Sequence, residues 1–391
     1  MKIAISIEHF EPRRGGGETY ARNFGRMLLD QGHEVHVYSF SMDPAEKGFI
    51  HHPLKQPAFN MFRRYAFAMR AQEQLLKESF DIIHGFGKSV CMDVFRPGGG
   101  VHKAWMAHEL RATDGALGRL GARLRQAASL DQRLVLRLER RQFGPGGRHE
   151  IVAVSNLVRQ EILTHYGCEP ERIHVVHNGA NLARFTPEKM RALRGPVRRR
   201  LGLDEDEIML LFLGHNYKRK GLHALIRALP LLKGKGRFRL VVVGKGRRAV
   251  CDRIAAGLGV SDLIRYAGTT DAAEEYYAAA DIFCFPSYYD PCANVVLEAL
   301  ACGLPVVTST TNGSGEILTA GREGYVTDPD DTERMAQYIG EFFPIERRRE
   351  ASRAARALAE ARPIERNFRE ILQVYQKVLD KKRFQPTCGG S

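Results

Sequence analysis

Residues 208–244 contain, in order, IMLLFLG (208–214), LHALIRALPLL (222–232) and FRLVVVG (238–244). The first and third segments are short apolar runs that end in glycine, which is typical of buried strands. The middle segment has the leucine spacing of a helix. A strand, a helix and another strand in this order predict a parallel sheet with helices on both faces, and therefore an α/β fold.

The same alternation extends in both directions from this unit. Further strands are expected at 2–7, 34–40, 80–87, 150–155, 172–179, 263–268, 281–286 and 304–309. Helices are expected after Gly17 and at 156–167, 248–258, 272–280 and 295–302. A densely charged segment, 188–207, contains Gly195 and Pro196 and is predicted to be a linker between two doubly wound, Rossmann-like units.

The predicted domains are therefore 1–185 and 186–362, followed by a final segment, 363–391. That segment begins with an amphipathic helix at 365–379, which we expect to return to the first domain. It ends in a tail, QPTCGGS, which has no core-forming residues and which we expect to be disordered.

The charge of the chain indicates the kind of partner it binds. Its 391 residues include 59 Lys and Arg against 45 Asp and Glu, a formal net charge of +14. This excess predicts an anionic partner, which could be nucleic acid, a lipid surface or a phosphorylated ligand. No apolar segment approaches the ~20 residues that span a bilayer, and the N-terminal run is too short for a secretory signal. The seven cysteines lack a C-x-x-C pair, which favours a reducing cytoplasm.

Two glycine-rich loops follow expected strands. Gly15, Gly16 and Gly17 precede a helix, where they could let a backbone approach an anionic ligand or could form a flexible surface turn. Gly244 and Gly246, with Ala249, fit the G-x-G-x-x-A fingerprint of dinucleotide binding. The acidic residue that this fingerprint requires is out of register, so an NAD(P)-dependent oxidoreductase remains only an alternative.

The segment GHNYKRKG (214–221) places Lys218, Arg219 and Lys220 directly before a helix. Three cations at a helix N-terminus oppose the helix dipole, and a phosphate group would relieve that conflict. The alternative is an ordinary basic surface turn.

The segment DPCANVVLEALACGLP (290–305) contains a carboxylate, Glu298, within an otherwise apolar helix. Asn294 is expected to be the N-cap of this helix, which leaves Glu298 one position too far for a capping box. The paired hydroxyl groups of a ribose would satisfy its two oxygens, whereas the alternatives are a solvated helix face or an ion pair with an arginine. Asp290 lies in the loop before the helix, beside amides that suit an anion.

Taken together, these segments resemble the family 4 retaining glycosyltransferases, which have the GT-B architecture. The resemblance covers nearly the whole chain. It rests on the early glycine loop, on IVAVSNLVRQEI followed by IHVVHNGANLARF, on FLGHNYKRKG, and on PSYYDPCANVVLEALACGLPVVTS with its spacing of Asp290 and Glu298. Within the family, the similarity points to lipopolysaccharide core glucosyltransferases that act on heptose.

The resemblance implies two Rossmann-like domains facing each other across a cleft. It implies transfer of a hexose, in the first instance glucose, from a UDP-sugar to a glycan or lipid-linked acceptor with retention and without a metal or other cofactor. Lys220 would stabilise the departing diphosphate together with Arg184 or Arg219 and the amides of Asn294 and Val295. Asp290 would bind the sugar, Glu298 the ribose, and the loop at Gly16 and Gly17 would lie on the acceptor side.

The sequence also departs from the family pattern. His215 stands where relatives often have an arginine, and Ala293 where they often have glycine. Asp290 replaces a glutamate, so its reach to the sugar is shorter and the donor sugar could differ from glucose. A glycosyltransferase that acts on another envelope glycan is a further alternative. No general base is evident, although His84, His102 and His108 are candidates in the acceptor domain.

Residues 103–141 form a basic region with nine Lys and Arg against four acids. Its leucines and arginines alternate at helical spacing, which favours a helix that binds an anionic membrane surface over one that packs on the sheet. We therefore expect a cytoplasmic protein that is peripheral on the inner face of the cell membrane. Nucleic acid is not expected as a partner, because aromatic residues do not alternate with the basic ones and no nucleic-acid motif is present.

Overall fold

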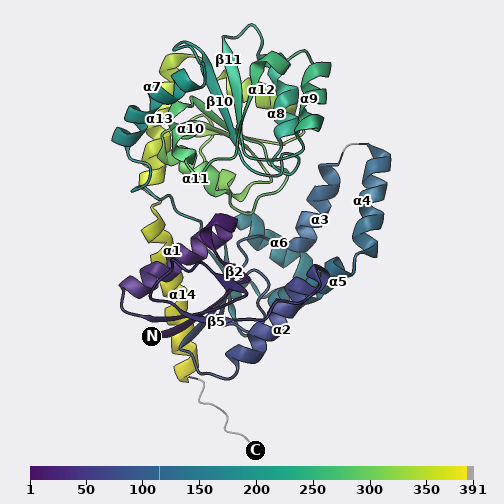
Figure 1. Cartoon of the computed structure of the whole chain (residues 1–391), viewed down its shortest axis with the longest axis vertical. Coiled ribbons are helices and arrows are strands. Elements are labelled where there is room, and N and C mark those ends of the chain that lie inside the picture. Colours follow the sequence, from purple (N-terminus) through teal and green to yellow (C-terminus); the bar gives the residue numbers. More distant parts are fainter. Residues whose placement is uncertain (114, 385–391) are drawn as a thin grey trace, which may run out of the picture. The chain divides into compact units, whose positions relative to one another are not determined.

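The computed structural model describes residues 1–113 and 115–384, and it divides into two compact units (Figure 1). The first unit comprises Met1–His177 together with the chain from Phe368, and the second comprises Asn178–Asn367. The division thus falls at 177/178, where the sequence predicted 185/186. The expected disorder of the tail QPTCGGS lies outside the described residues.

The first unit is built on a seven-stranded parallel sheet of order β5-β3-β1-β6-β7-β8-β9. Its strands are β1 (Lys2–Ser6), β3 (Glu34–Ser39), β5 (Ile50–Pro53), β6 (Ile82–Phe86), β7 (Val94–Arg96), β8 (Glu150–Ala153) and β9 (Ile173–Val175). A separate pair is formed by β2 (His9–Phe10) and β4 (Ser41–Met42). Ile3 of β1 pairs with Val35 on one side and Ile82 on the other, which places β1 inside the sheet.

Seven helices of the described chain belong wholly or largely to this unit. They are α1 (Gly16–Asp30), α2 (Arg63–Leu75), α3 (His102–Arg111), α4 (Ala116–Ala128), α5 (Leu130–Phe143), α6 (Asn156–Tyr166) and α14 (Ile364–Phe384). From Phe368 onward α14 packs beside α1, because the rings of Phe368 and Tyr375 both contact Phe24 (Figure 1). The C-terminal helix therefore belongs to the fold of the N-terminal unit over most of its length.

The second unit contains a six-stranded parallel sheet of order β12-β11-β10-β13-β14-β15. Its strands are β10 (Ile208–Leu213), β11 (Phe238–Val243), β12 (Ile264–Gly268), β13 (Ile282–Phe285), β14 (Val306–Ser309) and β15 (Gly324–Thr327). Its helices are α7 (Pro187–Arg200), α8 (Leu222–Ala228), α9 (Arg248–Gly257), α10 (Ala273–Ala279), α11 (Asn294–Ala301), α12 (Thr332–Gly340) and α13 (Ile345–Glu360).

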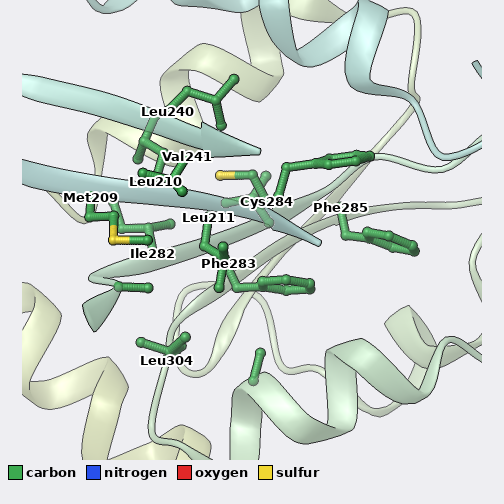
Figure 2. Packing of buried hydrophobic residues seen from close by; sticks show 14 of the residues in the cluster. Met209, Leu210, Leu211, Leu240, Val241, Ile282, Phe283, Cys284, Phe285 and Leu304 are labelled. Atoms are coloured by element: carbon green, nitrogen blue, oxygen red, sulfur yellow. The ribbon is translucent and has the colours of Figure 1, made fainter. Parts of the chain in front are cut away.

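The core of the second unit lies on both faces of the central strands. Figure 2 shows Leu210 and Leu211 of β10 packing with Val241 of β11 and with Ile282 and Phe283 of β13. All five side chains are fully buried, which agrees with strands covered by helices on both sides. The predicted α/β class with two doubly wound domains is confirmed.

The predicted linker at 188–207 is wrong, because most of it is the helix α7. Thr186 caps this helix by accepting a hydrogen bond from the Lys189 amide, at 3.3 Å, and Pro187 occupies its first position. Arg198 is buried and donates to Asp281 at 3.0 Å, so the charges of the segment hold it to the domain. These partners outweigh the helix-breaking tendency of Pro196, which lies inside the helix.

Candidate functional site

A short loop from β10 to α8 positions the predicted phosphate-binding cations. The loop ends at Gly221, whose φ is +79°. A β-carbon on this residue would lie 1.8 Å from the carbonyl oxygen of Pro286, just after β13. Only glycine satisfies both conditions, and this close approach brings Lys220 to the carboxyl end of β13.

Lys220 and Asp290 form an ion pair in which Lys220 Nζ donates to Asp290 Oδ2. The two side chains are only 14% and 12% exposed, and Nζ also lies 5.3 Å from the centre of the Phe285 ring. Burial lowers the pKa of Lys220, and the charge of Asp290 opposes that shift. The structure thus brings together two predicted site residues that are 70 positions apart in the sequence.

The loop after Asp290 holds this residue in place. Its amide donates to the carbonyl oxygen of Thr311 at 3.0 Å, and its own carbonyl oxygen accepts from the Gly313 amide at 2.9 Å. Because the backbone is fixed on both sides, the carboxylate of Asp290 is directed by the fold and not by a flexible turn.

Arg219 is the arginine whose charge acts on Lys220. Its positive charge contributes to the lowered pKa of the neighbouring lysine. Its Nε atom is buried and has no hydrogen-bond partner among the described residues. A buried donor without a partner costs free energy, and a bound phosphate oxygen would satisfy it.

Arg184, the other candidate, is held by Glu274. Its Nη2 atom donates to Glu274 Oε2 at 2.7 Å, and Lys189 binds the other oxygen of this carboxylate at 3.1 Å. The charge of Arg184 also acts on Glu298, where it opposes the rise in pKa that burial causes. The structure therefore places Arg184 with Glu274 and Glu298, whereas Arg219 accompanies Lys220.

Glu298 contacts Tyr277, a residue that the sequence reasoning did not identify. The Tyr277 hydroxyl donates to Glu298 Oε2 at 2.9 Å. Burial raises the pKa of Glu298, while the hydrogen bond from Tyr277 and the charge of Arg184 act in the opposite direction. The Glu298 residue keeps partial exposure to solvent, and its Oε1 accepts no hydrogen bond from the described residues. The segment AAEEYYAAA at 272–280 carries no signal in the sequence that would have revealed this contact.

The expectation that Asn294 is the N-cap is wrong by one position. The helix α11 begins at Asn294 itself, and the cap residue is Ala293, which has no side chain that could accept from the helix amides. The Asn294 side chain instead accepts a hydrogen bond from Asn178 Nδ2 at 2.7 Å. The amides at the start of α11, including that of Val295, are consequently not capped by the residue before the helix.

The glycines of the dinucleotide fingerprint serve internal packing. A β-carbon on Gly244 would lie 2.2 Å from the carbonyl oxygen of Gly214, and one on Gly246 would lie 2.3 Å from the Tyr217 ring. The Tyr217 hydroxyl donates to the Gly244 carbonyl oxygen at 2.8 Å. The contacts between the two loops thus account for both glycines without a dinucleotide.

The glycine loop of the first unit lies at the N-terminus of α1, which begins at Gly16. The Thr19 hydroxyl organises this turn by donating to the carbonyl oxygens of Pro12, at 2.8 Å, and Gly15, at 2.9 Å. Gly17 is exposed, and a β-carbon there would meet no atom within 4 Å. Internal packing does not explain this glycine, and close approach to a ligand stays a prediction.

The three candidate histidines make structural contacts in the first unit. His84 is fully buried, its Nδ1 lies 2.7 Å from the Tyr375 hydroxyl, and burial with the charge of Arg96 holds its pKa well below the usual range. His102 contacts Gln132 and stacks on Trp105, with 5.0 Å between ring centres. His108 Nε2 lies 3.8 Å from Glu161.

The basic region folds as α3, α4 and α5, with α4 packed on the other two (Figure 1). Three leucines of α4 are exposed: Leu117 by 85%, Leu120 by 53% and Leu124 by 63%. Their spacing places them on one face of the helix, and the buried Ala122 lies on the opposite face. The leucines therefore point away from the domain. No helix in the described ranges combines the length and hydropathy needed to cross a bilayer.

Two family models match the chain in succession. Residues 14–184 match the model described as Glycosyltransferase Family 4, and residues 194–358 match the model described as Glycosyl transferases group 1. The two matches together include the glycine loop, the Lys220 loop and the Asp290–Glu298 segment. The fold and these matches define the chain as a glycosyltransferase of the GT-B class. The two models together span most of the chain and place it in glycosyltransferase family 4, as its sequence motifs predicted.

Among its relatives, the chain is similar to the lipopolysaccharide glucosyltransferase WaaG of Escherichia coli K12. The two are 27% identical over 345 residues, which cover 87% of this chain and 88% of WaaG. A D-inositol 3-phosphate glycosyltransferase of Acidothermus cellulolyticus is 34% identical over 242 residues, but these cover only 58% of this chain and 53% of that protein.

Solved structures show the same fold. A crystal structure of WaaG covers 99% of this chain and 100% of its own, with a TM-score of 0.78 and 24% identity. Anabaena HepE, solved in complex with UDP and glucose, covers 96% of this chain and 100% of its own, with a TM-score of 0.69 and 18% identity. The predicted resemblance to lipopolysaccharide core glucosyltransferases is confirmed at the level of family and fold.

Proposed function

We propose that this glycosyltransferase transfers a hexose, in the first instance glucose, from a UDP-sugar to a glycan of the lipopolysaccharide core type, with retention of configuration. The observation that carries the proposal is the buried Lys220–Asp290 pair beside Arg219, whose Nε has no partner in the described chain. The likeness to WaaG supports the acceptor, and the HepE complex with UDP and glucose supports the donor.

The proposed chemistry uses oriented positive charge at the leaving group. The bond between the anomeric carbon and the diphosphate oxygen breaks, and the acceptor hydroxyl forms the new glycosidic bond on the same face. Lys220, Arg219 and the amides at the start of α11 stabilise the charge that develops on the diphosphate, so the proposal needs no metal ion. The acceptor proton passes to the departing phosphate oxygen, whereas His84, His102 and His108 keep the contacts described above.

Donor binding redistributes the partners of the ion pair. Lys220 Nζ donates to the diphosphate instead of to Asp290, and Asp290 accepts hydrogen bonds from the sugar hydroxyls. Glu298 accepts from the ribose hydroxyls through the oxygen that Tyr277 leaves unoccupied. Asp290 is one methylene shorter than the glutamate of the family pattern, so its geometry selects which hexose is accepted.

A donor screen tests the proposed function. The protein is incubated with a heptose-containing core glycan and, in turn, with UDP-glucose, UDP-galactose and UDP-N-acetylglucosamine. The masses of the products are measured by mass spectrometry. We expect the acceptor to gain one hexose from UDP-glucose, and we expect Glu298→Ala to raise the KM for this donor about tenfold, because a charged hydrogen bond contributes about 1.5–3 kcal/mol. No transfer from any UDP-sugar, or an unchanged KM, contradicts the proposal. Transfer to D-inositol 3-phosphate instead would indicate the activity for which the D-inositol 3-phosphate glycosyltransferase relatives are named.

We further propose that α4 binds an anionic membrane surface, which would place the enzyme as a peripheral protein on the cytoplasmic face. Its exposed leucines can enter the interface between headgroups and acyl chains, while Arg119, Arg123 and Arg125 flank them on the same short helix. Each basic residue near an anionic surface contributes about 1 kcal/mol. A helix that packed only against its own domain would instead turn its leucines inward.

The membrane proposal predicts that Leu117→Ser/Leu124→Ser weakens binding to vesicles about tenfold or more, since each buried leucine contributes about 1.5–3 kcal/mol. Cosedimentation with phosphatidylcholine vesicles, with and without phosphatidylglycerol, measures the effect. Leu76→Ser is the control, because Leu76 is 70% exposed but lies at the end of α2. Equal binding by the double variant and the wild type would refute the role of α4.

A further inference from the structure

A cavity of about 430 Å³ lies in the second unit between α7, α10 and α13, on the side where these helices appear together in Figure 1. Its walls include Asp281, which precedes β13, and Leu304 and Pro305, which precede β14. It therefore opens at the amino ends of the strands. Lys220 and Asp290 follow the carboxyl ends of β10 and β13, so the cavity is separate from the candidate donor site.

The cavity is lined by an excess of arginines: Arg191, Arg194, Arg348, Arg349 and Arg353. Among its described lining residues, Asp281 is the single acid. Both oxygens of this carboxylate are already engaged, by Arg194 at 2.6 Å and by the buried Arg198 at 3.0 Å. Both oxygens of Asp281 are thus engaged within the fold, and no second acid lies among the described lining residues of the cavity.

The remaining arginines have weak partners or none. Arg191 and Arg349 pair with glutamates that are 75% and 74% exposed, and exposed pairs of this kind hold a cation loosely. Arg353 makes no ion pair or hydrogen bond with any residue in the described ranges and is exposed. A phosphate group could recruit these guanidinium groups without breaking a buried interaction.

Arg348 shows the same surplus of positive charge at the inner wall. Its guanidinium donates to the carbonyl oxygens of Phe342, at 3.1 Å, and Phe343, which fixes its position. Burial lowers the pKa of Arg348, and repulsion from Arg194 and Arg198 adds to that shift although Asp281 opposes it. An anion in the cavity would reduce this repulsion.

We propose that this cavity is a binding site for a small soluble molecule that carries a phosphate or diphosphate group. The guanidinium fork matches phosphate oxygens in pairs, and Ser352 adds a hydroxyl donor to the same wall. Met190, Leu304 and the ring of Tyr277 provide an apolar wall for an organic portion of the ligand. The volume accommodates more than a single phosphate group.

The site also borders the machinery of the proposed reaction. Tyr277 lines the cavity and, through its hydroxyl, holds Glu298. The proposal of an anion site nevertheless does not depend on the assigned donor, because its arginines belong to α7 and α13 and none of them is Lys220 or Arg219.

Calorimetric titration with inorganic pyrophosphate tests the proposal on the full chain. We expect a binding event that Arg353→Ala weakens at least fivefold and that Lys220→Ala retains. The matched control is Arg199→Ala, which removes the same charge from an exposed position on α7 outside the cavity. Thermal unfolding of each variant verifies that it is folded.

Four results would overturn the proposal. The first is the absence of pyrophosphate binding, and the second is binding that Lys220→Ala abolishes while Arg353→Ala leaves it unchanged. The third is cosedimentation with phosphatidic acid vesicles that depends on Arg353 when pyrophosphate does not bind, since this would assign the arginines to a lipid headgroup. Equal weakening of pyrophosphate binding by Arg199→Ala and Arg353→Ala would indicate that the net charge of the protein alone attracts the anion, and it would likewise exclude a specific site.

Discussion

Lys220→Met is expected to lower kcat for hexose transfer by about 10²–10³-fold, which is the usual effect of removing one group that stabilises developing negative charge. Methionine keeps the length and apolar stem of the side chain but cannot pair with a diphosphate. Steady-state transfer from UDP-glucose measures the change. Lys233→Met is the control, because Lys233 is an exposed lysine of the same unit whose Nζ donates to the Gly259 carbonyl oxygen, at 2.7 Å, and to no other described residue.

Removal of Lys220 also leaves Asp290 without its partner at 12% exposure, and an unpaired buried carboxylate destabilises the fold. The double variant Lys220→Met/Asp290→Asn separates the two effects, since it removes both charges together. We expect it to recover thermal stability and to remain inactive. A double variant that regained transfer would show that the lysine acts only by supporting Asp290.

Gly221→Ala is expected to destabilise the second unit by about 4 kcal/mol or more. Alanine at φ +79° is strained, and its β-carbon would lie 1.8 Å from the Pro286 carbonyl oxygen, so the loop and the end of β13 must separate. UDP affinity should fall as well, because the same contact positions Lys220.

The control for this substitution is Gly234→Ala. Gly234 has nearly the same φ, +83°, but a β-carbon there meets nothing within 4 Å. It carries the conformational penalty without the collision, so we expect a loss of about 1 kcal/mol. Urea unfolding is followed by circular dichroism, because the single tryptophan, Trp105, lies in the first unit. Similar losses for both variants would show that the contact with Pro286 is not required.

The strands of both sheets could be predicted because their residues alternate with helical segments and are continuously apolar. The strand expected at 208–214 is β10, Ile208–Leu213, and that expected at 150–155 is β8, Glu150–Ala153. Prediction was wrong where charge and proline suggested an irregular segment. At α7 the cap of Thr186 and Pro187 was present in the sequence, but the partner of Arg198, Asp281, is 83 positions away.

The sequence named the candidate site as a set of residue types, and the structure adds the contacts that these residues make. Lys220, Arg219, Asp290 and Glu298 were identified from local motifs that place cations and carboxylates around expected helix starts. The contact of Arg184 with Glu274 could not be predicted, because the two residues are 90 positions apart in the sequence. The sequence could not show that Asn294 lies inside the helix. Its side chain accepts a hydrogen bond from Asn178, which is 116 positions away, instead of capping the helix.

The sequence by itself determined two α/β units of a family 4 glycosyltransferase and the cations and acids available to each, because periodicity and short motifs are local properties of the chain. Only the tertiary structure decided which acidic and basic side chains form ion pairs and that the Tyr277 hydroxyl binds Glu298. It also decided that the leucines of α4 face away from the domain and that arginines of α7 and α13 line one cavity. These contacts join residues that are distant in sequence, and their geometry depends on how helices and strands pack after the local elements have formed.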